Sequence, residues 1–406
     1  MAAFIYSPVD FVFTCVGLPL FLLDIGLDVW AAVNFYQEEA FLSLAVLVLL
    51  LLGSSVLVQV YSWLWYSYEN FEMETEVERC MSVNGVKLLH VLQLGIYLRH
   101  AGVLEVSVKN CKSRDGNPED VAVFLSHDLS MLRIIETFSE SAPQLVLMIT
   151  IYLQEGRLDL VTVLKALGSI SAVAFCVTTY HRSLRSFLPD KTKQQVGSSV
   201  VYFLWNLLLL LPRLVAMALF ASVLPCFIFT HFLCSWLLLF FCAWRCQTEF
   251  MDSPGGEWVY RATVALIWYF DWFNVVEGKT RTRTLLYHTY ILVDISILCA
   301  VWFWKMNTDP PHFVFPPLYA TIIAVAVVTL YILGLLVKLM YYKFFHPSIP
   351  RDELRGESTE TLRLGDQIDG PERLMMRSLP AHDVTEHSQR ERSNKRMRKL
   401  AENFYS

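Results

Sequence analysis

Long apolar runs alternate with short polar loops over the first 345 or so residues of the chain. A helix needs about 20 mainly apolar residues to cross the hydrocarbon layer of a bilayer. Ten runs approach or exceed that length, near residues 8–35, 40–66, 82–104, 126–153, 159–182, 199–221, 223–246, 258–278, 286–305 and 317–344. The pattern predicts an all-α polytopic membrane protein.

The basic residues between the runs decide which runs cross the bilayer, because Lys and Arg gather in cytoplasmic loops. If all ten runs cross, two of the three basic clusters lie on the opposite side from the third. If the third and eighth runs enter and leave on the same side, all three clusters and both termini are cytoplasmic. We therefore expect about eight spanning helices plus two re-entrant helices. The clusters are Lys109, Lys112 and Arg114; Arg182, Arg185, Lys191 and Lys193; and Lys279, Arg281 and Arg283.

With this assignment the same order of segments occurs twice along the chain: two spans, one re-entrant helix and two more spans. This order predicts two pseudo-symmetric helical repeats, at residues 1–185 and 186–346, although the two halves share no evident sequence identity. Folds of this kind often place their working site where the repeats meet. Residues 347–406 form a separate, polar cytoplasmic tail.

The composition narrows the class of protein. Hydrophobic residues make up 55% of the chain and charged residues 17%, which excludes a water-soluble domain of this length. Most of the nine cysteines that the sequence contains lie inside apolar runs, so no disulfide framework is expected. The sequence holds no HExxH, P-loop, GxSxG or selectivity-filter motif. We expect no enzymatic activity, no metal, no cofactor and no nucleic-acid partner.

Ionisable residues recur inside the apolar runs. Such residues cost several kcal/mol each unless they are paired or hydrated, so they are candidates for function. Asp24 and Asp28 share one helical face because they are four residues apart, and Glu136, Glu140 and Gln144 repeat the same spacing. The candidate residues are Asp10, Asp24, Asp28, Arg99, Glu136, Glu140, Arg213 and Asp294.

These charges have two interpretations. They can be structural ion pairs between helices, and Arg99 and Arg213 are natural partners for the carboxylates. They can also line a polar route for something hydrophilic, such as an ion, a small solute or a lipid headgroup. A pure scaffold rarely accumulates so many buried carboxylates, because apolar packing holds helices together at lower cost. The set as a whole therefore favours a route.

The tail contains a candidate protease site. Pro347 and Pro350 end the last helix, and residues 350–385 are polar enough for disorder to be expected. In the stretch LGDQIDGP, Asp366 and Asp369 bracket two residues and the small Gly370 follows. Executioner caspases cut after such a DxxD sequence, so cleavage is expected between Asp369 and Gly370.

Several stretches carry a resemblance to a known family. They include FLLDIGLDVWAAVNFY, LLHVLQLGIYLRH, DLSMLRIIETFSESAPQL, EWVYRATVA and YYKFFHP. Together they resemble the XK-related membrane protein family, in consistent order from about Asp10 to Pro347. Within that family, GSSVVYFLWNLLLL, FNVVEGKTR and DQIDG resemble a caspase-activated phospholipid scramblase.

The resemblance implies a plasma-membrane protein that moves phospholipids without ATP once its tail is cut, exposing phosphatidylserine on dying cells. It also implies a single-span immunoglobulin-domain partner of the basigin or neuroplastin type, and it maps the family's buried polar residues onto the eight candidates above. One departure is Thr179, which stands where an acidic residue precedes Tyr-His-Arg in the similar protein.

The mechanistic hypothesis is that a headgroup slides along a polar furrow while its acyl chains stay in lipid. We expect Asp24, Asp28, Glu136, Glu140, Arg99 and Arg213 to line this furrow. A solute transporter or channel would instead have a closed central site, and a structural partner subunit without transport activity would use the buried charges only to hold helices together.

Overall fold

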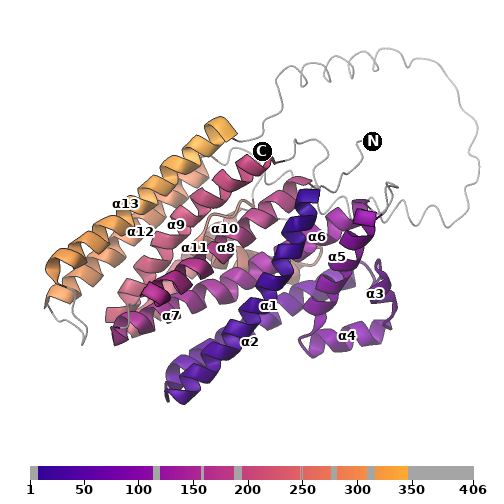
Figure 1. The fold of residues 1–406 in the computed structure, drawn as a ribbon, viewed down its shortest axis with the longest axis horizontal. Helices are drawn as coiled ribbons and strands as arrows, with labels where there is room; N and C mark the ends of the chain where they lie inside the picture. Colours follow the sequence, from indigo (N-terminus) through magenta and orange to yellow (C-terminus); the bar gives the residue numbers. More distant parts are fainter. Residues whose placement is uncertain are drawn as a thin grey trace, which may run out of the picture.

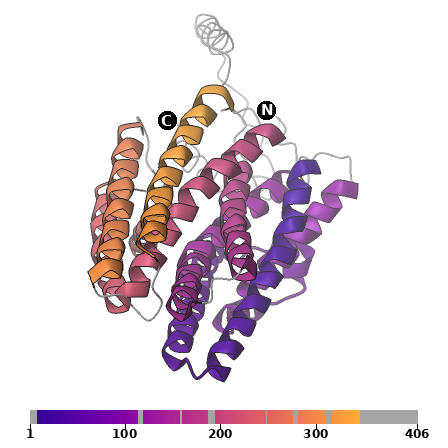
Figure 2. The ribbon, with the colours of Figure 1, turned by 60° about the vertical axis from the view of Figure 1, so that its left-hand side comes forward.

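The computed structural model describes residues 8–112, 119–156, 160–186, 194–246, 248, 250–275, 281–308 and 316–345. These residues form helices and connecting turns, with no strand among them. Figures 1 and 2 show long helices packed roughly parallel or antiparallel into one bundle. The helices are α1 (Pro8–Gln37), α2 (Phe41–Tyr68), α3 (Glu76–Arg79), α4 (Val83–Val91), α5 (Gly95–Lys112), α6 (Glu119–Glu136), the π-helix η1 (Thr137–Ser141), α7 (Ala142–Glu155), α8 (Leu160–Ser186), α9 (Val196–Val223), α10 (Pro225–Arg245), α11 (Pro254–Phe270), α12 (Arg281–Thr308), α13 (Pro317–Met340) and the π-helix η2 (Tyr341–Phe345).

Seven helices in the described part of the chain are long and apolar enough to cross a membrane: α1, α2, α8, α9, α10, α12 and α13. Many large apolar side chains on α1, α2 and α10 are exposed to the surroundings of the bundle. In a soluble protein such surfaces would be buried. The chain is therefore a multi-pass α-helical membrane protein.

The fourth apolar run does not form one regular helix. It is split into α6, η1 and α7, and the wider π turn precedes Pro143 at the start of α7. Proline has no N–H and its ring crowds the carbonyl one turn earlier, here that of Ser139, so an extra residue in the turn relieves the conflict. This polar, interrupted segment is not among the seven helices, and the count of eight spans stays a prediction.

The third run is broken as well. Gln93, with a positive φ of 65°, turns the chain between α4 and α5. Its amide oxygen accepts a hydrogen bond of 2.8 Å from Ser55 in the middle of α2. Ser55 precedes the end of α2 by 13 residues, or about 20 Å at a rise of about 1.5 Å per residue. The turn thus lies deep along its neighbour rather than at its end.

The eighth run forms α11, which also stops partway along its neighbours. Before its first turn, the Ser253 hydroxyl hydrogen bonds to Tyr68 at the end of α2, at 2.8 Å. Near its last turn, the Tyr269 carbonyl accepts a hydrogen bond from Arg213, well inside α9. The chain then leaves the helix at Asp271 without continuing to the far end of the bundle.

The bundle has two distinct ends. One end, here called the basic end, holds the starts of α1, α9 and α12 and the ends of α2, α8, α10 and α13 (Figure 2). It carries most of the arginines that lie near helix termini: Arg182, Arg185, Arg245, Arg281 and Arg283. The opposite end holds the α1–α2 and α9–α10 turns, and contacts such as Gln154 to the Ser222 carbonyl join α7 to α9 there. The charge is therefore strongly asymmetric along the bundle axis.

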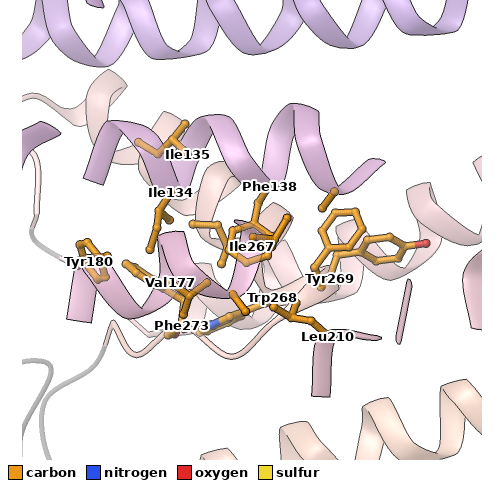
Figure 3. Packing of buried hydrophobic residues seen from close by; sticks show 14 of the residues in the cluster. Ile134, Ile135, Phe138, Val177, Tyr180, Leu210, Ile267, Trp268, Tyr269 and Phe273 are labelled. Carbon is orange, nitrogen blue, oxygen red and sulfur yellow. Dashed lines mark hydrogen bonds between the residues drawn. The ribbon is translucent and has the colours of Figure 1, made fainter. Parts of the chain in front are cut away.

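One hydrophobic core joins the two halves of the sequence. Figure 3 shows Phe138 from η1 and Val177 from α8 packed near Leu210 of α9 and Ile267 of α11. The central helix is α9, whose neighbours include α7, α8, α12 and α13. Both predicted repeats thus contribute side chains to the same core.

A short helix is fastened to the basic end by a carboxylate. Glu105 on α5 accepts hydrogen bonds from the backbone N–H groups of Glu76 and Val77 in α3, at 3.1 and 2.9 Å, and from Lys109 at 2.8 Å. Partial burial raises the pKa of the Glu105 carboxyl, but these hydrogen bonds outweigh it and hold the pKa below its ordinary value. Glu105 thus acts as a remote cap for α3.

Candidate functional site

A cavity of about 720 Å³ runs beside α1 and α8, bounded inside by α5, α6 and α7. We call it the first cavity. Phe13 and Arg182 line it at the basic end, and Trp30 and Lys165 line it at the opposite end. Lys165 and Arg182 are 17 residues apart on α8, about 25 Å along the axis. The cavity therefore extends over most of the roughly 30 Å thickness of a hydrocarbon layer.

Small residues keep this cavity open. The wall formed by α8 carries a stripe of small or short side chains, and α1 contributes Gly17. A Cβ added at Gly17 or at Gly168 would meet no atom within 4 Å. These glycines therefore do not serve close helix packing; the missing side chains leave space. The short residues of the α8 wall include Gly168, Ser169, Ala172, Cys176 and Thr179.

Asp24 and Asp28 lie on the α1 wall of this cavity, one turn apart as their spacing predicts. Asp24 accepts a hydrogen bond of 3.2 Å from the Ser141 hydroxyl, and its carboxylate lies 4.0 Å from the Arg133 guanidinium. Asp28 accepts a 2.7 Å hydrogen bond from the Gln144 amide. The break at η1 thus presents polar groups to α1 at the depth of both carboxylates.

A second cavity of about 640 Å³ lies on the other side of α1, against α2. Glu136 and Glu140 line it, and Asp28 lines both cavities. Glu136 accepts a 2.5 Å hydrogen bond from Arg133. The buried amide of Gln59 faces the second cavity and has no hydrogen-bond partner among the described residues. An unpaired buried amide is unfavourable without water or a ligand, so this wall is suited to polar contents.

Arg99 is placed elsewhere. It is buried against α2, where its Nη1 lies 3.6 Å from Asp128 and its Nε donates a 2.8 Å hydrogen bond to Ser62. Its guanidinium also stacks 4.2 Å from the centre of the Tyr66 ring. Arg99 lines neither cavity. Asp128 was not among the candidate residues, although it lies two helical turns before Glu136 and extends the same four-residue series.

Arg213 and Asp294 form a third polar group, between α9 and α12. Arg213 is fully buried and donates one hydrogen bond to Asp294 and another of 3.1 Å to the Tyr269 carbonyl. The second oxygen of Asp294 lies 3.0 Å from His231 Nε2 on α10. This group connects four helices and lines neither cavity.

The structure therefore divides the candidate residues. Asp24, Asp28, Glu136 and Glu140 come together around the two cavities. Arg99 and Arg213 were expected to line the same furrow, but they belong, with Asp294, to ion pairs away from both cavities. Asp10 lies in the first turn of α1, and its side chain is outside the described part. The expected cleavage site at Asp366, Asp369 and Gly370 also lies outside the described residues.

Sequence reasoning did not identify the two cations at the ends of the first cavity as part of this site. Arg182 donates hydrogen bonds of 3.0 Å to the Gln194 carbonyl and 2.6 Å to the Ser199 hydroxyl, so it also ties α8 to α9. Thr179, one helical turn before Arg182, also lines the cavity, and its hydroxyl donates a 2.9 Å hydrogen bond to the Phe175 carbonyl. The sequence feature that could have identified Lys165 and Arg182 is their position at opposite ends of one apolar run.

Comparison with known proteins gives a consistent result. The protein family described as XK-related protein matches residues 12–347. The chain is 45% identical over 358 residues to XK-related protein 8 of Tetraodon nigroviridis, covering 86% of each chain. It is 37% identical over 407 residues to XK-related protein 8 of Pan troglodytes, covering 98% of this chain and 94% of that one.

Proposed function

The chain belongs to the XK-related family, and we propose that it acts as a phospholipid scramblase of the plasma membrane. It moves phospholipids in both directions without ATP and without enzymatic chemistry or a cofactor. It is activated when an executioner caspase cuts the tail after Asp369, and it then exposes phosphatidylserine on apoptotic cells. A single-span immunoglobulin-domain chaperone of the basigin or neuroplastin type accompanies it to the surface.

The single observation that carries this proposal is that the first cavity is lined both by carboxylates and by apolar side chains exposed on the outside of the bundle. Asp24 and Asp28 line it, while Leu23 and Leu27, which also line it, are 57% and 44% exposed. A closed central site would bury such leucines. The barrier to lipid movement is the dehydration of the headgroup, and a charged, hydrated wall lowers that barrier while the acyl chains remain in hydrocarbon.

The membrane arrangement that fits this activity has eight spans, with α6, η1 and α7 together as the eighth, and re-entrant segments at α4–α5 and α11. The basic end faces the cytoplasm, in agreement with the distribution of Lys and Arg, so both termini are cytoplasmic. The pseudo-symmetric repeats at residues 1–185 and 186–346 are part of the same proposal. The depth of the Gln93 turn beside Ser55 supports a re-entrant third segment.

The division of the charges assigns them separate roles. Asp24 and Asp28 contact the headgroup that moves along the first cavity, and Asp10 extends this series toward the basic end of α1. Glu136 and Glu140 line the second cavity, which Asp28 joins to the first. The pairs of Arg99 with Asp128 and of Arg213 with Asp294 hold the helices that form the walls.

Reconstitution tests the activity directly. The protein, purified with any partner that accompanies it, is placed in liposomes holding a trace of fluorescent phosphatidylserine. Dithionite, which bleaches only label in the outer leaflet, is added before and after caspase treatment, and the remaining fluorescence is measured. We expect bleaching of about half the label without caspase and nearly all of it afterwards.

The matched control is Asp369→Ala, which should remain inactive after caspase treatment while folding normally. Ion or solute flux without lipid movement would favour a transporter or channel. Absence of any transport from the cleaved, correctly folded protein would favour a structural subunit.

A further inference from the structure

Two side chains bridge α1 and α8 at the opposite end of the first cavity. Lys165 Nζ lies 4.8 Å from the centre of the Trp30 ring, and both residues line the cavity. Lys165 is five residues after the start of α8, and Trp30 is in the second-last turn of α1. The pair therefore stands where the cavity meets the membrane surface.

The charge of Lys165 is not matched within the described part of the chain. No carboxylate there lies within 4.0 Å of its ammonium group, and its contact is the face of an indole. By contrast, Arg133 in the same cavity binds Glu136, and Arg182 donates to Ser199 and Gln194. An ammonium over an aromatic ring keeps N–H donors free for an anion.

The surroundings of Lys165 indicate the kind of anion. Its neighbours Val163, Leu164 and Leu167 are exposed apolar residues on a helix that crosses the membrane. Trp30 is 43% exposed and amphipathic, a residue typical of the depth of lipid headgroups. An anion that reaches a cation among such side chains is itself attached to acyl chains, and the anionic group that phospholipids share is the phosphodiester.

We propose that Lys165, positioned by Trp30, is the binding site for the phosphodiester of a phospholipid entering or leaving the first cavity from the leaflet at the opposite end. This inference rests on the proposed function, because it names a residue that recognises the transported lipid. It adds a chemical preference: the site favours lipids with a phosphate over lipids with an uncharged sugar headgroup.

The test compares two fluorescent lipids in the same liposomes. Phosphatidylcholine carries the phosphodiester and glucosylceramide does not. The caspase-treated variant Lys165→Gln should move phosphatidylcholine at least about tenfold more slowly, as expected for loss of one hydrogen bond between charged groups, and should move glucosylceramide at the unchanged rate. Lys165→Arg should retain both rates, because it restores the cation.

Lys305 provides the matched control. Its ammonium lies 5.8 Å from the centre of the Trp304 ring near the end of α12, and it lines neither cavity. Lys305→Gln should leave both rates unchanged. An equal loss of both lipids in Lys165→Gln, or no loss of either, overturns the inference while leaving scrambling itself established. If the unsubstituted, cleaved protein moves neither lipid, the proposed function fails as well.

Discussion

The ion pair between Arg213 and Asp294 offers the sharpest prediction about what holds the bundle together. Arg213 is 0% exposed; its Nη1 bonds to Asp294, its Nε to the Tyr269 carbonyl, and its Nη2 has no hydrogen-bond partner among the described residues. Asp294→Ala removes the carboxylate that neutralises this guanidinium. Removing one partner of a buried pair typically costs about 3–5 kcal/mol, because the other charge remains buried and unpaired.

Such a loss is a large part of a folding free energy of about 5–15 kcal/mol. We expect the melting midpoint in detergent, measured by fluorescence-detected size exclusion, to fall by about 10 °C. The double variant Arg213→Met, Asp294→Leu should recover much of this loss because no unpaired charge remains. The result that would refute the reasoning is a single variant with an unchanged midpoint that has lost lipid movement. That outcome would place Asp294 in the lipid route.

Two further predictions concern helix packing and pH. Gly334→Leu should lower the melting midpoint and separate α13 from α9, because a Cβ added at Gly334 would lie only 3.0 Å from the backbone carbonyl carbon of Leu208. An unchanged midpoint would contradict this close approach of the two helices. Glu105→Gln should speed hydrogen exchange of the α3 amides. Because the folded pKa of Glu105 is lowered, its contribution is complete above the ordinary glutamate pKa of about 4.3 and is lost as pH falls through the folded value. Exchange in α3 that is insensitive both to the substitution and to acid, after correction for intrinsic rates, would refute the capping role.

The length of the apolar runs predicted the all-α, multi-pass character of the fold for a simple physical reason. A spanning helix must satisfy its own backbone and present apolar side chains to lipid, so its length and composition are visible in the sequence. The third run was expected to turn back, but the position of the turn at Gln93, between α4 and α5, was not predicted. The π turn before Pro143, which splits the fourth run, was not predicted at all. Both depend on contacts with other helices, such as that of Gln93 with Ser55.

The candidate site shows the same division between local and distant information. Four-residue spacing on one helix placed Asp24 beside Asp28 and Glu136 near Glu140, because helix geometry alone sets those relations. The spacing along one helix could not show which carboxylate pairs with each buried arginine. Asp128 reaches Arg99 only through the packing of α5 against α6.

The approach of Lys165 to Trp30 joins segments more than a hundred residues apart. No spacing along a single helix encodes such a contact, so it became visible only with the arrangement of α1 beside α8.

The central claim is tested most directly by comparing the transport rates of two variants, one of which narrows the first cavity without disturbing helix packing. Gly17 and Gly26 both lie on α1, and a Cβ added at either would meet no other atom within 4 Å. Gly17 lines the first cavity, whereas Gly26 lines neither cavity. Leucine favours a helix over glycine by up to about 1 kcal/mol, so both variants should fold. After caspase treatment in liposomes, Gly17→Leu should move fluorescent phosphatidylserine at least about tenfold more slowly, which corresponds to about 1.4 kcal/mol in the barrier, while Gly26→Leu retains the original rate. Equal rates for the two variants would contradict the claim that headgroups pass along this cavity.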